Sequence, residues 1–159
     1  MDALGEEADY DPQSAAISSA YVAAFNSYVR RDLHFGEGKI FKPEAYDTVG
    51  AHWVFTHKPP GAFAAPPTAP NVMPDLASAM KYNPDLKIML NGGYYDLATP
   101  YFEGIYEMHH LQIPANLQSN IEYHYYQSGH MVYAHEDSLK RLHDNVAAFI
   151  RKTGRTKGE

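Results

Sequence analysis

The 159-residue sequence contains no cysteine, and this absence excludes several classes of protein at once. Without thiols, the chain cannot have a disulfide framework, a zinc site with cysteine ligands or a cysteine nucleophile. The absence does not fix the cellular compartment, so composition alone leaves the localisation open.

Basic surface and long apolar runs are also lacking. The formal net charge is -6 and the isoelectric point is near 5.8, so nothing suggests a basic surface that would neutralise nucleic-acid phosphates. No apolar run approaches the roughly 18 residues that a membrane-spanning helix needs. Residues 1–11 are acidic and do not have the basic-then-apolar order of a signal peptide. We therefore expect neither nucleic acid nor a membrane as a partner.

The first half of the chain has one clear helical segment and then an irregular stretch. Asp11 and Pro12 are typical of a helix cap and first turn, and the helix is expected to end near Leu33. Its apolar face would consist of residues at helical spacing: Ile17, Tyr21, Phe25, Tyr28 and Leu33. Six prolines between Pro59 and Pro74 then predict an extended linker.

The second half alternates helical and strand patterns. The expected helices cover 74–82, 100–111 and 136–152, and the expected strands cover 86–90 and 121–126. Inward positions are predicted in all three helices: Leu76, Met80, Ile105, Met108, Leu111, Leu139, Leu142, Val146, Phe149 and Ile150. This order indicates an α/β fold with parallel strands. Two strands make too small a sheet, so we expect the segment to be the edge of a larger one.

Each predicted strand is followed by a polar residue with catalytic potential. Asp96 lies in the loop after the first strand, and His130 lies in the loop after the second. Reactive groups of open α/β sheets collect at the carboxyl ends of strands. An acid followed by a histidine is also the chain order of the last two triad members in α/β-hydrolases. In that interpretation Asp96 orients the imidazole, which takes a proton from a serine hydroxyl.

Structural interpretations of both residues stay open at this point. Aspartate commonly caps a turn, and Asp96 lies in a turn-forming stretch. With nine histidines in the chain, a loop histidine beside a glycine can also arise by coincidence.

Two motifs resemble those of the serine carboxypeptidase family. The stretch Leu86 to Thr99, which includes Asn91-Gly92-Gly93-Tyr94-Tyr95-Asp96, is similar to the segment around that family's catalytic aspartate. Gly129-His130-Met131-Val132 is similar to its catalytic-histidine segment. The stretch from Tyr10 to Leu33 resembles a segment that bacterial members insert between core strands. The resemblance covers most of the chain from about Asp9 to Phe149.

The resemblance implies a fold and an activity. Residues 1–73 would be part of a helical cap or insertion segment with its Pro-rich linker, and residues 74–159 would be the C-terminal strands and helices of an α/β-hydrolase core. The complete protein would be a serine carboxypeptidase that hydrolyses the C-terminal peptide bond of peptides. Asp96 and His130 would be catalytic, and Met131 and Tyr95 would contact substrate. No metal or cofactor is implied, and a secreted or periplasmic location is slightly favoured.

One expected motif is missing from the sequence. Members of the family have a Gly-x-Ser-x-Gly nucleophile elbow, and none occurs here. We therefore expect the chain alone to be inactive. A missing N-terminal part of the same protein would carry the serine and be its partner, and self-association is a further expectation.

Other interpretations remain. The chain could be a non-catalytic interaction module, or part of an esterase or acyltransferase on the same scaffold. Six histidines between His109 and His143 suggest a metal, but no His-Glu-x-x-His motif is present, and a metal site is not expected. The tyrosine pairs 94–95 and 125–126 fit core or rim packing as well as a pocket wall.

Overall fold

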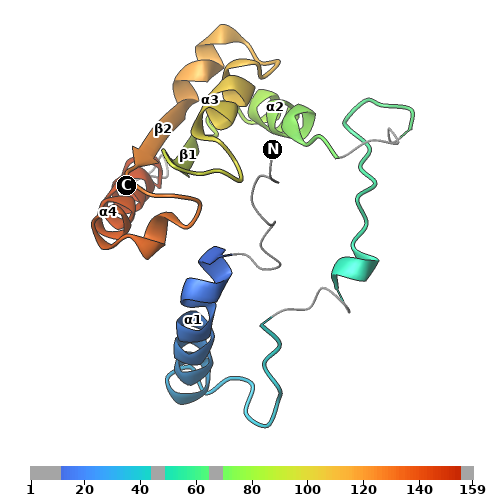
Figure 1. Ribbon diagram of the computed structural model, residues 1–159. Coiled ribbons are helices and arrows are strands. Elements are labelled where there is room, and N and C mark those ends of the chain that lie inside the picture. The colour runs from blue at the N-terminus through green and yellow to red at the C-terminus, as the bar shows by residue number, and fades with distance from the viewer. Residues whose placement is uncertain (1–11, 44–48, 65–69, 155–159) are drawn as a thin grey trace, which may run out of the picture. The chain divides into compact units, whose positions relative to one another are not determined.

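The computed structural model describes residues 12–43, 49–64 and 70–154 (Figure 1). The chain divides into two units, Met1–Val54 and Phe55–Glu159, which are described separately below. Asp11, the predicted cap of the first helix, lies outside the described residues.

In its described residues, the first unit has one long helix and a loop that folds back against it, where Phe41 contacts Phe25. Helix α1 covers Pro12–Arg31, and a short 3-10 turn, η1, covers Gly50–His52. The backbone beyond α1 turns through left-handed conformations, with φ of 50° at His34, 71° at Gly36 and 74° at Gly38, which ends the helix. Most of the predicted apolar face of α1 is exposed, so burial of that face is not seen within this unit.

The second unit alternates helices with parallel strands. Its elements, in chain order, are α2 (Met73–Tyr82), β1 (Ile88–Gly93), α3 (Tyr101–His109), η2 (Ala115–Asn120), β2 (Ile121–Tyr126), η3 (Val132–Ala134) and α4 (Glu136–Thr153).

Strands β1 and β2 pair in parallel over their whole length. The register runs from Ile88 opposite Ile121 to Gly93 opposite Tyr126. The prediction of β2 is confirmed at both ends. The prediction of β1 is wrong by two to three residues, because the strand begins at Ile88 and continues through Gly92 and Gly93.

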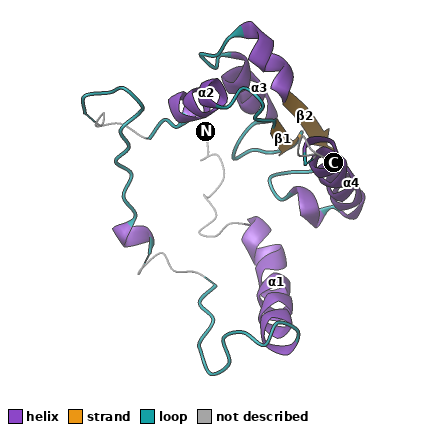
Figure 2. Ribbon diagram, turned by 180° about the vertical axis from the view of Figure 1, so that it is seen from behind, coloured by secondary structure: helices purple, strands orange, loops and turns teal. Residues whose placement is uncertain are grey.

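Helices lie on both faces of this strand pair, as Figures 1 and 2 show from opposite sides. Successive side chains of a strand point to opposite faces. Leu90 and Tyr125 point toward α3, where a Cβ at Gly104 would lie 3.0 Å from Leu90 Cδ2. Tyr126 points to the other face, where Asn145 of α4 donates a hydrogen bond to its hydroxyl over 3.1 Å.

The core lies between α2, α3 and the amino-terminal halves of the strands. Met80 is fully buried there, and Leu76 and Met108 pack against the same cluster, which confirms these predicted inward positions. Burying a side chain the size of Met80 stabilises the fold by about 1.5–3 kcal/mol. The buried members of this cluster are Ala77, Met80, Leu111, Leu117 and Ile121.

Helix α4 has the predicted bounds to within one residue, but its apolar stripe is less buried than predicted: Leu142, Val146 and Phe149 are partly buried. The side of α4 that faces β2 makes polar contacts, because Asn145 donates a hydrogen bond to Tyr126 and Lys152 donates one to Glu122. Leu139 and Ile150 of the apolar stripe are 44% and 60% exposed. The stripe is offset around the helix from the side that faces β2, so the strand pair covers only part of it.

Helices and a small parallel sheet together make this a mixed helix-and-strand unit, which agrees with the α/β class at that level.

Candidate active site

The loop after β1 holds the Asp96 carboxylate with hydrogen bonds from its own backbone. Asp96 Oδ1 accepts hydrogen bonds from the N–H groups of Ala98 and Thr99, over 2.8 and 2.9 Å. The Thr99 hydroxyl donates to Oδ2 over 2.8 Å. The turn-capping role that aspartate often has is thus present here, and it employs mainly one of the two carboxylate oxygens.

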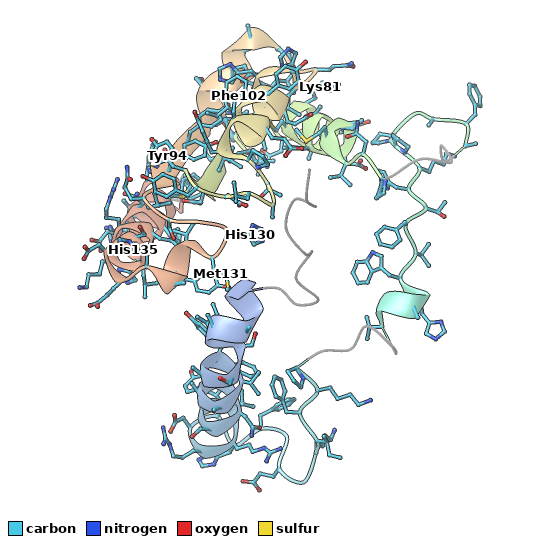
Figure 3. The ribbon with its side chains drawn as sticks, viewed as in Figure 1. Lys81, Tyr94, Phe102, His130, Met131 and His135 are labelled. Atoms are coloured by element: carbon cyan, nitrogen blue, oxygen red, sulfur yellow. The ribbon has the colours of Figure 1, made fainter. Side chains whose placement is uncertain are left out.

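The other oxygen faces the loop after β2. His130 Nδ1 and Asp96 Oδ2 lie 2.8 Å apart, so the two side chains that the strand order placed together are hydrogen-bonded. The Asp96 side chain is 6% exposed and the His130 side chain is 56% exposed. One edge of the imidazole is therefore held by a buried carboxylate while solvent reaches the rest of the ring. Figure 3 shows His130 beside Met131 in the segment between β2 and α4.

A close approach of the two backbones brings the loops together. The N–H of Tyr94 donates to the carbonyl of Tyr126 over 3.0 Å, and the N–H of Tyr95 donates to that of Ser128 over 3.0 Å. A Cβ at Gly93 would lie 2.3 Å from the carbonyl oxygens of both Ser128 and Gly129. Only glycine leaves room for this approach, so Gly93 is needed to place Asp96 next to the His130 loop.

The surroundings of Asp96 keep its carboxylate ionised. Burial raises the pKa of the carboxyl group, but hydrogen bonds from Thr99, His130 and Ala98 outweigh this effect. The pKa of Asp96 is therefore held well below its ordinary value. An ionised carboxylate can only accept hydrogen bonds, so the proton in the Asp96–His130 contact is on Nδ1 of the histidine. This leaves Nε2 of the neutral ring as a base.

A groove of about 390 Å³ lies beside the pair. Asp96, Thr99 and His130 line one part of it, and residues of α3 and β1, together with Met73, Tyr125 and Val132, line much of the rest. Three tyrosine rings stand together at this end of the sheet, with centroids 5.4–5.7 Å apart: Tyr94, Tyr101 and Tyr125. The pair thus borders a largely apolar hollow, which is the usual setting of a small-molecule or side-chain site.

The two residues predicted to contact substrate lie elsewhere in the loops. Tyr95 is 64% exposed, and its hydroxyl donates to Gln127 Oε1 over 2.6 Å. Met131 is partly buried immediately before η3. Neither Tyr95 nor Met131 lines the groove beside Asp96 and His130. Their contacts with substrate therefore stay predictions.

The other histidines of the second half pair individually with neighbours. His135 bonds to Ser138, and His143 bonds to Asp144 one residue away. Within residues 12–43, 49–64 and 70–154, no group of three or more His, Asp or Glu side chains could hold a metal ion. None of the helices in the described part of the chain has the length and apolar character to cross a membrane.

Thr99 is the member of the site that the sequence argument missed. It contributes two of the hydrogen bonds to Asp96, one from its N–H and one from its hydroxyl. The spacing Asp-x-x-Thr before Pro100 was a usable signal, because a hydroxyl at that distance can reach back to a capping carboxylate.

The arrangement can take up a proton at Nε2 of His130 and stabilise the imidazolium that results. No serine hydroxyl among the described residues is hydrogen-bonded to the His130 ring, whose Nδ1 lies near Asp96 and Thr99. Comparison with protein-family models, with curated proteins and with solved structures finds no match to this chain.

Proposed function

We propose that this chain supplies the acid and the base of a serine-type hydrolase, with His130 as general base and Asp96 as the residue that orients it. The 2.8 Å contact between a buried carboxylate and an exposed imidazole carries the proposal. This geometry leaves Nε2 free to accept the proton of a hydroxyl nucleophile and then to protonate a leaving group.

The proposed reaction is hydrolysis of the C-terminal peptide bond of peptides, by the complete protein. The motif resemblance supports this choice of substrate over an ester or another acyl group, since leaving-group preference depends on residues outside the pair. The nucleophile in this proposal is a serine carried by another part of the same protein. The serine attacks the carbonyl, His130 takes its proton, and the protonated ring gives that proton to the departing amine, which leaves an acyl-enzyme. Water then attacks the acyl group with His130 as base, and the ring returns the proton to the serine as the new carboxyl terminus departs.

The non-catalytic interaction module is the second candidate. The exposed apolar residues of α4 favour it, because such surfaces often mark protein contacts. An interaction module does not explain why a buried, ionised Asp96 lies beside His130, whereas the proposed hydrolase does.

A covalent probe tests the proposed function. The chain is produced together with the polypeptide encoded directly upstream of it and treated with a fluorophosphonate, which reacts with activated serines. We expect labelling of one serine in the upstream part, and at least about a hundredfold slower labelling in His130→Ala. Equal labelling in His143→Ala, at a histidine whose ring pairs with the neighbouring Asp144, is the control. Labelling that is absent, or that does not depend on His130, would count against the hydrolase.

A further inference from the structure

The Thr99 hydroxyl lies between the two members of the pair. Its oxygen is 2.8 Å from Asp96 Oδ2 and 3.4 Å from His130 Nδ1. Asp96 Oδ2 and His130 Nδ1 are themselves 2.8 Å apart, so the three polar atoms form a triangle. The hydroxyl is therefore in a position to act on both groups at once.

The hydrogen-bond inventory of these groups fixes where each proton lies. A threonine hydroxyl has one proton and two lone pairs, and an ionised carboxylate has no proton. The proton of Thr99 must then point at Asp96 Oδ2, which leaves a lone pair of the hydroxyl oxygen on the side of His130. Nδ1 of the ring consequently faces two acceptors, Asp96 Oδ2 and Thr99 Oγ1.

A ring nitrogen that faces two acceptors is stable only when it carries a proton. If Nδ1 were bare, its lone pair would face those of Oδ2 and Oγ1, and the hydrogen bond between the His130 ring and Asp96 would be lost. The loss is costly, because it removes a donor from a buried, ionised carboxylate. The tautomer with the proton on Nδ1 avoids this cost.

We propose that Thr99 is a positioning residue that holds the Asp96 carboxylate in place and restricts neutral His130 to the tautomer protonated on Nδ1. The two N–H donors to Oδ1 set one end of the carboxylate, and the Thr99 hydroxyl sets the other end by occupying the second lone pair of Oδ2. The result is a single orientation in which Nε2 is the bare nitrogen. Its value for catalysis rests on the proposed function, but the tautomer itself does not.

The test is nuclear magnetic resonance of the 159-residue chain with ¹⁵N-labelled histidine rings, at a pH where the His130 ring is neutral. The ring signals of His130 are identified by their loss in His130→Gln. In the wild-type chain we expect a protonated Nδ1 and a bare Nε2. Thr99→Val keeps the shape of the side chain and removes the hydroxyl, and the fraction of rings protonated on Nε2 should rise about three- to tenfold. Thr99→Ser should restore the wild-type signals.

Two further variants make the outcome decisive. Thr153→Val is the matched control, because the Thr153 hydroxyl bonds to the Phe149 carbonyl in α4, so its removal should leave the His130 signals unchanged. Thr99→Ala replaces the valine variant if that variant fails to fold, as judged from its circular dichroism. Wild-type ring signals in a folded Thr99→Val or Thr99→Ala chain would overturn the proposal. The readout needs no hydrolysis, so a failure here is distinct from a failure of the proposed function.

Discussion

The backbone at Gly93 passes so close to Ser128 that a Cβ at position 93 would lie 2.3 Å from the Ser128 carbonyl oxygen. This approach joins the two strand-end loops. Gly93→Ala forces backbone atoms apart, so we expect the free energy of unfolding to fall by about 2 kcal/mol or more and the Asp96–His130 hydrogen bond to lengthen. Urea unfolding and the His130 ring signals measure these two effects.

Gly129→Ala is the control for this substitution. A Cβ at Gly129 would meet nothing closer than the Tyr95 carbonyl oxygen at 3.7 Å, which is an ordinary contact. Its free energy of unfolding should stay within about 0.5 kcal/mol of the wild-type value. Equal effects of the two variants would show that the close approach at Gly93 is not needed.

The hydroxyl of Tyr126 links β1, β2 and α4. This residue is fully buried, and its hydroxyl donates to Asn91 Oδ1 over 2.9 Å while it accepts from Asn145 Nδ2 over 3.1 Å. Tyr126→Phe leaves these two amide groups without their partner, and we expect a loss of about 1–3 kcal/mol in the free energy of unfolding. Tyr82→Phe, at a residue 89% exposed, should change it by less than about 0.5 kcal/mol. A Tyr126→Phe chain as stable as the Tyr82→Phe chain would contradict this account.

Ionised Asp96 makes the stability of the chain depend on pH. Its pKa is lower in the folded chain than in the unfolded chain, so its contribution is present above the unfolded value, near 4. The contribution is lost as the pH falls from there through the folded value. In Asp96→Asn, the free energy of unfolding should therefore fall less steeply between about pH 5 and pH 2 than in the wild type. Parallel curves for the two chains in urea unfolding at a series of pH values would exclude this role of Asp96.

The exposed part of the apolar stripe on α4 predicts association of the isolated chain. Leu139 and Ile150 are 44% and 60% exposed, and water contact at such side chains is reduced when molecules associate. Sedimentation should show self-association or a poorly folded chain, and Leu139→Gln with Ile150→Gln should weaken the association. A well-folded monomer at all concentrations would be the opposite result.

The sequence predicted the elements that depend on local patterns better than those that depend on contacts between elements. The apolar and aromatic residues of β2 lie between polar turns, and its bounds were correct. The prediction for β1 ended too early because a glycine pair usually breaks a strand, whereas Gly93 continues this one by admitting a neighbouring backbone. The predicted burial of Leu139 and Ile150 was wrong, because helical periodicity identifies an apolar stripe but does not show which part of the protein packs against it.

The candidate site was predictable in its two main residues and not in its support. Strand order was enough to place Asp96 near His130, because carboxyl ends of neighbouring parallel strands lie at one edge. The role of Thr99 depends on how the loop after β1 folds back so that Thr99 reaches the Asp96 carboxylate. A periodic sequence pattern does not predict this loop conformation.

The turnover number of the His130→Ala enzyme is the most direct test of the central claim. If the proposed function is correct, peptidase assays on this chain combined with its upstream part should show kcat lower by several orders of magnitude in His130→Ala, because the proposed serine nucleophile would lose its base. Asp96→Asn should be severe as well, Met131→Ala should mainly change substrate preference, and His143→Ala should match the wild type. A kcat near the wild-type value in His130→Ala would contradict the assignment and leave the interaction module as the better account.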